Sequence, residues 1–142
     1  MFKFFKNETK DKKKNSDLIS KTASLLIHAA KIDENYSLKE ETIIKKTLLK
    51  LGANQNELDA LIASAKSNEE KANQILDYTR EIKTMDEKNK VRIIKSLWQI
   101  IYSDKDADIY ETNLMRRLSG LLYIDNKTMG DIKEQIKKEK LS

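Results

Sequence analysis

Residues 98–122, WQIIYSDKDADIYETNLMRRLSGLL, contain the pattern that decides the fold. An apolar run with helical spacing ends at Asp104, and the acidic turn Asp104-Lys105-Asp106-Ala107-Asp108 follows it. A second amphipathic run begins at Ile109 and has Glu111 in its first turn. This stretch therefore predicts two helices joined by an acidic turn.

The same pattern occurs earlier, in residues 27–46, IHAAKIDENYSLKEETIIKK. Subtracting 71 from the residue numbers of the later copy gives the matching residues of the earlier one: Asp104 and Asp33, Asp106 and Asn35, Asp108 and Ser37, Glu111 and Glu40, Met115 and Ile44, Leu122 and Leu51. An internal repeat is stronger evidence about a fold than local propensity. We therefore expect two related helix–acidic turn–helix units that pack as two halves of one domain.

The composition favours a single all-α domain. The 142 residues are enough to bury a core, and the chain has no proline and only three glycines. Cysteine is absent, which excludes disulfides and thiolate metal sites. No apolar run approaches the roughly 20 residues that span a bilayer, and the N-terminus lacks the apolar segment of a signal peptide. We expect a soluble, cytoplasmic protein.

Apolar residues at intervals of three and four predict seven helices and no strand. Several helix starts carry the capping-box pattern, in which a polar cap precedes Glu by three residues: Ser37 and Glu40, Asn54 and Glu57, Thr84 and Glu87, Asp108 and Glu111. Gly52 predicts a left-handed helix end, and Asp125 a cap for the last helix. The Ser67-Asn68-Glu69-Glu70 segment is expected to start the fourth helix. The helical domain is expected over residues 17–140, with His28 and Trp98 in structural roles.

Residues 1–16 form a basic leader. They hold six lysines against Glu8 and Asp11, so most of the net charge of +5 lies here and the rest of the chain is nearly neutral. We expect a disordered leader, because little after Phe5 is apolar. The alternative is a membrane-surface contact, in which aromatic rings enter the headgroup layer and lysines approach anionic lipid. The residues of this contact are Phe2, Phe4, Phe5, Lys3, Lys6, Lys12, Lys13 and Lys14.

The two acidic turns are the candidate metal site. Their side-chain oxygens favour a hard cation, Ca²⁺ or Mg²⁺, bound weakly, since each turn lacks the glycine and the final glutamate of a calcium-binding EF-hand loop. The candidate ligands are Asp33, Asn35, Glu40, Asp104, Asp106, Asp108 and Glu111. The alternative is that Glu40 and Glu111 only cap helices, which is worth about 1 kcal/mol for each cap.

The repeated Asp, the Glu seven residues later and the apolar-basic helix that follows resemble the TerB-like (tellurite-resistance TerB) family over residues 18–135. In the second copy, Tyr110-Glu111 followed by Leu114-Met115-Arg116-Arg117-Leu118 carries the resemblance most closely. Glu34 and Lys105 stand where the family usually has glycine. The resemblance implies an all-helical fold, an acidic cluster proposed to bind metal, and a role in tellurite and stress resistance, often at the membrane.

The expected function is that of a non-enzymatic TerB-like binding or scaffold domain with an unidentified protein partner. The sequence contains no phosphate-binding loop, no Ser–His–Asp set and no Glu-x-x-His motif of a di-metal bundle. No cofactor is required, although weak Ca²⁺ or Mg²⁺ binding is one hypothesis. A peripheral membrane adaptor at the inner face of the membrane is the alternative. No specific nucleic-acid binding is expected, because only the leader is strongly basic.

Overall fold

Helix is the only regular structure in the part of the chain that the structure describes. The structure is a computed structural model that describes residues 2–31, 37–71, 75–103 and 109–141. Its elements are α1 (Phe2–Lys31), α2 (Leu38–Lys50), the short 3₁₀ helix η1 (Gln55–Glu57), α3 (Leu58–Lys71), α4 (Leu76–Ile82), α5 (Glu87–Ile101), α6 (Ile109–Leu121) and α7 (Asn126–Leu141). Within these ranges, the prediction of an all-α fold with seven α-helices is confirmed.

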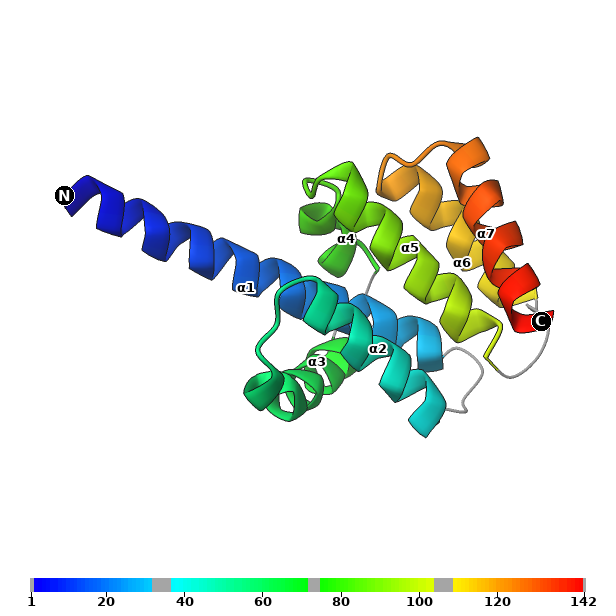
Figure 1. Ribbon diagram of the computed structural model, residues 1–142, viewed down its shortest axis with the longest axis horizontal. Helices are drawn as coiled ribbons and strands as arrows, with labels where there is room; N and C mark the ends of the chain where they lie inside the picture. Colours follow the sequence, from blue (N-terminus) through cyan, green and yellow to red (C-terminus); the bar gives the residue numbers. More distant parts are fainter. Residues whose placement is uncertain (1, 32–36, 72–74, 104–108, 142) are drawn as a thin grey trace.

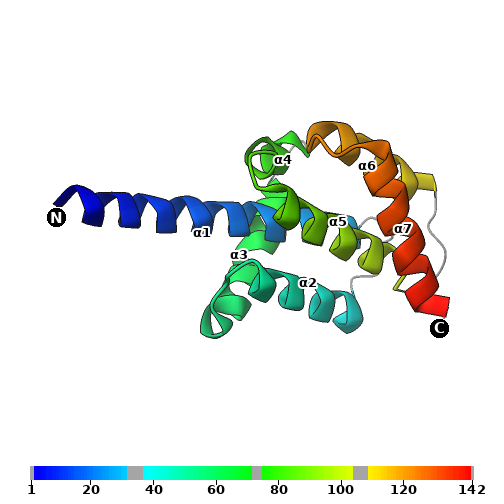
Figure 2. The ribbon, with the colours of Figure 1, turned by 45° about the horizontal axis from the view of Figure 1, so that its top comes forward.

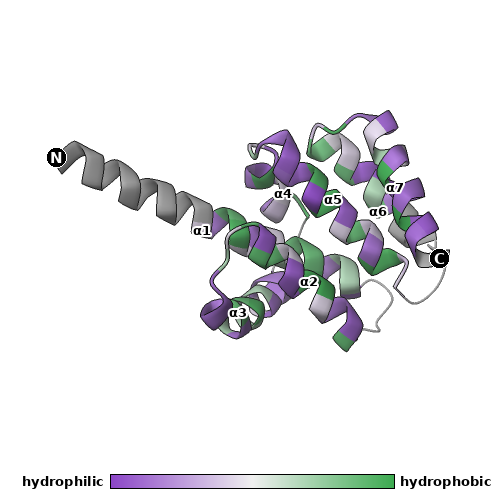
Figure 3. Cartoon of the chain, viewed as in Figure 1, coloured by the Kyte–Doolittle hydropathy of each residue, from purple (hydrophilic) through white to green (hydrophobic). Residues whose placement is uncertain are grey.

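The second half of α1 is the centre of the domain. It packs against α2, α3, α4 and α5, while α7 packs on α5, and α4 contacts α6. Figure 1 shows α2 and α3 on one side of α1 and α4 and α5 on the other, and Figure 2 shows the same arrangement from a second direction. Apolar residues (green) and polar residues (purple) alternate along α2 and α5 in Figure 3, as they do in helices that are buried on one side.

The first half of α1 is helical where the sequence analysis expected a disordered leader. The helix begins at Phe2, and its N-terminal part extends away from the other helices (Figure 1). Residues 2–16 contain no proline or glycine, and extending an existing helix avoids the cost of nucleation. No helix within the described ranges has the length and apolar content of a membrane span.

Helices α2 and α6 begin and end 71 residue numbers apart, and they end in the same way. Gly52 (φ 108°) and Tyr123 (φ 58°), which are equivalent in the repeat, both have left-handed backbone. The N–H groups of Ala53 and Ile124 both donate to the carbonyl five residues earlier, at 2.9 Å. This confirms the helix end predicted at Gly52. That the two units pack as related halves remains a prediction.

Three helix boundaries differ from those predicted. The first is the start of α5: its cap is Asp86, which accepts the N–H of Asn89 at 2.9 Å, so the capping box predicted at Thr84 and Glu87 is wrong.

The other two boundaries lie at the two ends of α3. Asn54 caps only η1, and α3 continues to Lys71 through the Ser67-Asn68-Glu69-Glu70 segment that was expected to start the next helix. This favourable cap sequence does not interrupt the helix, and Glu69 within it contacts His28 and Lys31 of α1. The cap predicted at Asp125 is confirmed: its Oδ1 accepts the N–H of Thr128 at 2.7 Å, which lowers the pKa of the Asp125 carboxyl.

Two leucines on α2 test the packing of this helix. Leu48 is 0% exposed and Leu38 is 82% exposed. Leu48→Ala should lower the free energy of unfolding by about 2–5 kcal/mol, because it removes buried methyl groups and leaves a cavity. Leu38→Ala, the matched control, should change it by less than about 0.5 kcal/mol. Urea denaturation measures both. Equal effects would mean that α2 does not pack as described.

Candidate functional site

The structure describes only part of the predicted cation site. Five of the seven candidate ligands, those within the turns, lie outside the described residues: Asp33, Asn35, Asp104, Asp106 and Asp108. For Glu111 only the helical backbone in α6 is described. Among the described side chains, no three His, Asp or Glu residues form a group that would hold a metal ion. The membrane-contact residues lie in the first half of α1, where the backbone alone is described.

Glu40, the remaining candidate ligand, is a helix cap with a buried side chain. It is 1% exposed, and its Oε1 accepts hydrogen bonds from the backbone N–H of Ser37 at 3.2 Å and from the Ser37 hydroxyl group at 3.0 Å. The Ser37 Oγ in turn accepts the N–H of Glu40. The capping box predicted at Ser37 is therefore confirmed.

Residues that flank the two acidic turns are hydrogen-bonded to each other. The Nζ of Lys39 donates to the backbone oxygen of Ser103 at 2.8 Å. Lys39 lies in the first turn of α2, just after the first acidic turn, and Ser103 immediately precedes the second. The place where the chain leaves the first turn therefore lies beside the place where it enters the second.

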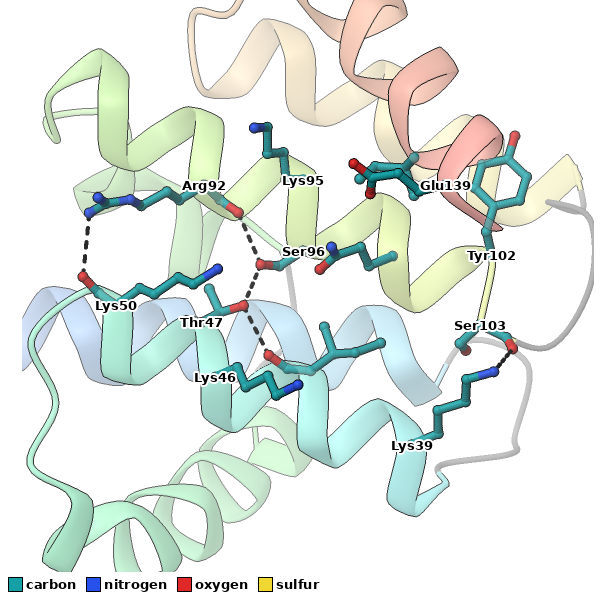
Figure 4. A pocket seen from close by; sticks show the side chains of 13 residues that line it. Lys39, Lys46, Thr47, Lys50, Arg92, Lys95, Ser96, Tyr102, Ser103 and Glu139 are labelled. Atoms are coloured by element: carbon teal, nitrogen blue, oxygen red, sulfur yellow. Dashed lines mark hydrogen bonds between the residues drawn. The ribbon is translucent and has the colours of Figure 1, made fainter. Parts of the chain in front are cut away.

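A basic groove of about 550 Å³ lies between α2 and α5 and reaches α7 (Figure 4). Lys39, Lys46 and Lys50 line it from α2, Arg92 and Lys95 line it from α5, and Glu139 is its acidic lining residue. The hydroxyl groups of Thr47 and Ser96 bond to each other across the two helices at its floor, and both residues are buried. Such small side chains allow the two helices to approach closely.

This groove was not predicted from the sequence, because most of the net charge lies in residues 1–16. The signal was present in the spacing. Lys39, Lys46 and Lys50 are seven and four residues apart, which places them on one face of a helix. Their meeting with Arg92 and Lys95 depends on how α2 and α5 pack, which the local pattern does not contain.

A second polar cluster joins α1, α3 and α4. The Oε1 of Glu69 lies 3.2 Å from the imidazole Nδ1 of His28, and its Oε2 lies 3.1 Å from the Nζ of Lys31. The Tyr78 hydroxyl group donates to the Glu69 carbonyl oxygen at 3.4 Å. Burial, followed by the charges of Glu69 and Asp77, raises the pKa of Tyr78 to about 12. His28 thus links α1 to α3 through Glu69, which is the structural role that was expected for it.

These features define the class of protein: an all-α domain, with seven α-helices in the described part of the chain and a charged groove between two of them. The chain belongs to the TerB family, because the sequence profile described as "Tellurite resistance protein TerB" matches residues 20–134. The resemblance drawn from the acidic turns is therefore confirmed.

The structural comparison agrees at the level of the fold. The crystal structure of PG1108, a protein of unknown function from Porphyromonas gingivalis W83, superimposes with a TM-score of 0.61 at 19% sequence identity. The match covers 85% of this chain and 95% of the other. Comparison with curated protein sequences finds no match.

The raised pKa of Tyr78 predicts a loss of stability at high pH. Between pH 10 and about pH 12 the unfolded chain has lost a phenol proton that the folded chain keeps, so the free energy of unfolding falls as the pH rises. Tyr78→Phe should lose less stability over this range than the wild type. Urea denaturation at both ends of the range, with Tyr123→Phe as the exposed control, measures the difference. Equal losses in the wild type and both variants would contradict the assignment.

Proposed function

We propose that this chain is a non-enzymatic binding domain that responds to a divalent cation where α2 begins and α5 ends. The observation that supports this is the hydrogen bond from Lys39 to the Ser103 backbone oxygen. Lys39 follows the first acidic turn and Ser103 precedes the second, which supports treating candidate ligands 71 residues apart in the sequence as one site. Tellurite resistance is the setting that the family's description suggests, and a wider role in stress resistance is part of this proposal.

The donor chemistry fits a hard cation bound weakly. The candidate ligands supply carboxylate and amide oxygens, which Ca²⁺ and Mg²⁺ prefer. Glu40 is a carboxylate that is almost inaccessible to water, and a buried carboxylate gains from a positive charge nearby. Its Oε1 already accepts two hydrogen bonds from Ser37, so less of its coordinating capacity remains for a metal. Weak affinity follows from this.

A calcium titration followed by amide chemical shifts tests this proposal. Shifts should be confined to residues 33–41 and 104–112, and the melting temperature should rise, because a ligand that binds only the folded state stabilises it. Asp33→Asn and Asp104→Asn should each abolish the shifts of their own turn. Asp131→Asn, an exposed position on α7, is the control. If millimolar calcium moves neither turn and leaves the melting temperature unchanged, Glu40 and Glu111 are caps alone.

A peripheral membrane adaptor is the second candidate function. The N-terminal part of α1 extends away from the rest of the domain in Figures 1 and 2, so its end is free of the helices that pack on the second half. This is the segment whose sequence holds Phe2, Phe4 and Phe5 among lysines. The apolar part is short, so binding to an anionic surface would be weak and dependent on salt.

Vesicle flotation tests the adaptor proposal. The full chain should float with phosphatidylserine-containing vesicles at low salt and fail to float with phosphatidylcholine alone. Replacing Phe2, Phe4 and Phe5 with serine should remove flotation, because the lysines that remain provide only electrostatic attraction. Lys127→Ser, on α7, is the control and should float normally. Flotation that survives the triple substitution would assign the contact to another surface.

A further inference from the structure

The basic groove between α2 and α5 has a local charge that the net charge of the chain does not reveal. Five cationic side chains line it, against one carboxylate, that of Glu139. Figure 4 shows Lys46 and Lys50 extending from α2, with Arg92 and Lys95 on the facing helix. Charges of one sign gathered in a cleft with protein walls concentrate the electric potential there and attract a partner of opposite sign.

Three of these cations are unpaired among the described residues, whereas Lys39 and Lys45 of α2 have partners. Within the described residues, the ammonium groups of Lys46, Lys50 and Lys95 have no hydrogen-bond acceptor and no carboxylate partner. By contrast, Lys45 of α2 pairs with Asp59 at 3.2 Å. Like charges held close together without counter-charges repel one another, and a bound anionic partner would remove this cost.

The cations form a row and do not converge on one point. Lys39, Lys46 and Lys50 follow one face of α2 over 11 residue steps, a length of about 16 Å at 1.5 Å per residue. Arg92 and Lys95 lie across the groove on α5. A row of this length matches acidic side chains that repeat along a peptide better than it matches one phosphate group.

The side-chain types also favour a peptide. A phosphate site is commonly built from arginine forks or backbone N–H groups that point at the anion. Arg92 is the one arginine among the described residues that line this groove. It already donates to the backbone oxygen of Lys50 at 3.4 Å and to Asn89 Oδ1 at 3.2 Å. Ile43 and Ile136 add apolar surface to the lining, which an amphipathic segment would cover.

We propose that the groove between α2 and α5 is the docking site for an acidic, amphipathic segment of a partner protein. Glutamate or aspartate side chains of that segment meet Lys46, Lys50 and Lys95, and its apolar side chains cover Ile43 and Ile136. This contact uses none of the candidate cation ligands, so it stands or falls separately from the cation proposal.

Fluorescence anisotropy with the full chain and a labelled synthetic peptide tests this. The peptide has about 12 residues, enough to follow the row as a helix, with glutamates at every third or fourth position and leucines on the other face. A matched peptide has glutamine in place of every glutamate. The glutamate peptide should bind saturably at low salt and more weakly as salt rises, and the glutamine peptide should not bind.

Charge reversal in the groove should weaken this binding, and reversal elsewhere should not. Lys46→Glu with Lys50→Glu should raise Kd about tenfold or more, and Lys95→Gln alone about threefold. Lys71→Glu with Lys127→Glu changes the net charge by the same amount at exposed positions outside the groove. This control should change Kd less than about twofold, because exposed charges away from the peptide contribute little to its binding. Circular dichroism confirms that the variants remain folded.

Several results would overturn the proposal. These are equal weakening in the groove and control variants, binding of the glutamine peptide with the same affinity, and the absence of saturable binding. Tighter binding of tripolyphosphate or single-stranded DNA than of the peptide, lost in the Lys46/Lys50 variant, would also overturn it, because the groove would then be a phosphate site.

Discussion

The structure depends on the burial of one helix segment on all of its sides. From Thr22 to Ile27 every residue of α1 is at most 1% exposed, and Ala29 and Ala30 continue the buried run. A helix that is enclosed in this way has no side that faces water, so each of its polar side chains needs a hydrogen-bond partner inside the protein. Thr22 and Ser24 meet this condition by donating to the carbonyl oxygens of Leu18 and Ser20, four residues earlier.

This central segment determines how the other helices are placed. Helices α2 and α5 both pack on α1, and they also pack on each other. Their mutual contact contains the buried hydroxyl pair of Thr47 and Ser96, whose oxygen atoms also lie within hydrogen-bonding distance of the carbonyl oxygens of Ile43 and Arg92 in their own helices. Small side chains at this contact keep the two helix backbones close, and the longer lysine and arginine side chains above them form the walls of the groove. The charged surface is thus a consequence of core packing.

The sequence predicted the features that depend on residues close together in the chain. The helices, the capping box at Ser37 and the left-handed end at Gly52 follow from spacings of three to five residues, and each is present in the structure. Predictions from the sequence were wrong or missing where two local signals compete, and where residues distant in the chain come into contact. The Ser67–Glu70 segment has the sequence of a helix start, yet it lies inside α3, where Glu69 contacts α1. The contacts of Glu69 with His28 and Lys31 join residues about 40 positions apart, which no local pattern contains.

Helix α2 shows how one short segment carries several roles at once. Ile44 and Leu48 are fully buried and face the core. Glu41 and Lys45 form ion pairs with Lys66 and Asp59 of α3.

The face of α2 that holds Lys39, Lys46 and Lys50 lines the groove. Because a helix repeats every 3.6 residues, the three faces use different residues, and a change on one can leave the others intact. Carboxylates pair with Lys45 and Lys66 where α2 meets α3, whereas the ammonium groups of Lys46 and Lys50 in the groove have no partner among the described residues. A chain that is nearly neutral outside its first 16 residues therefore still presents a cationic surface, and the position of charge decides what it attracts.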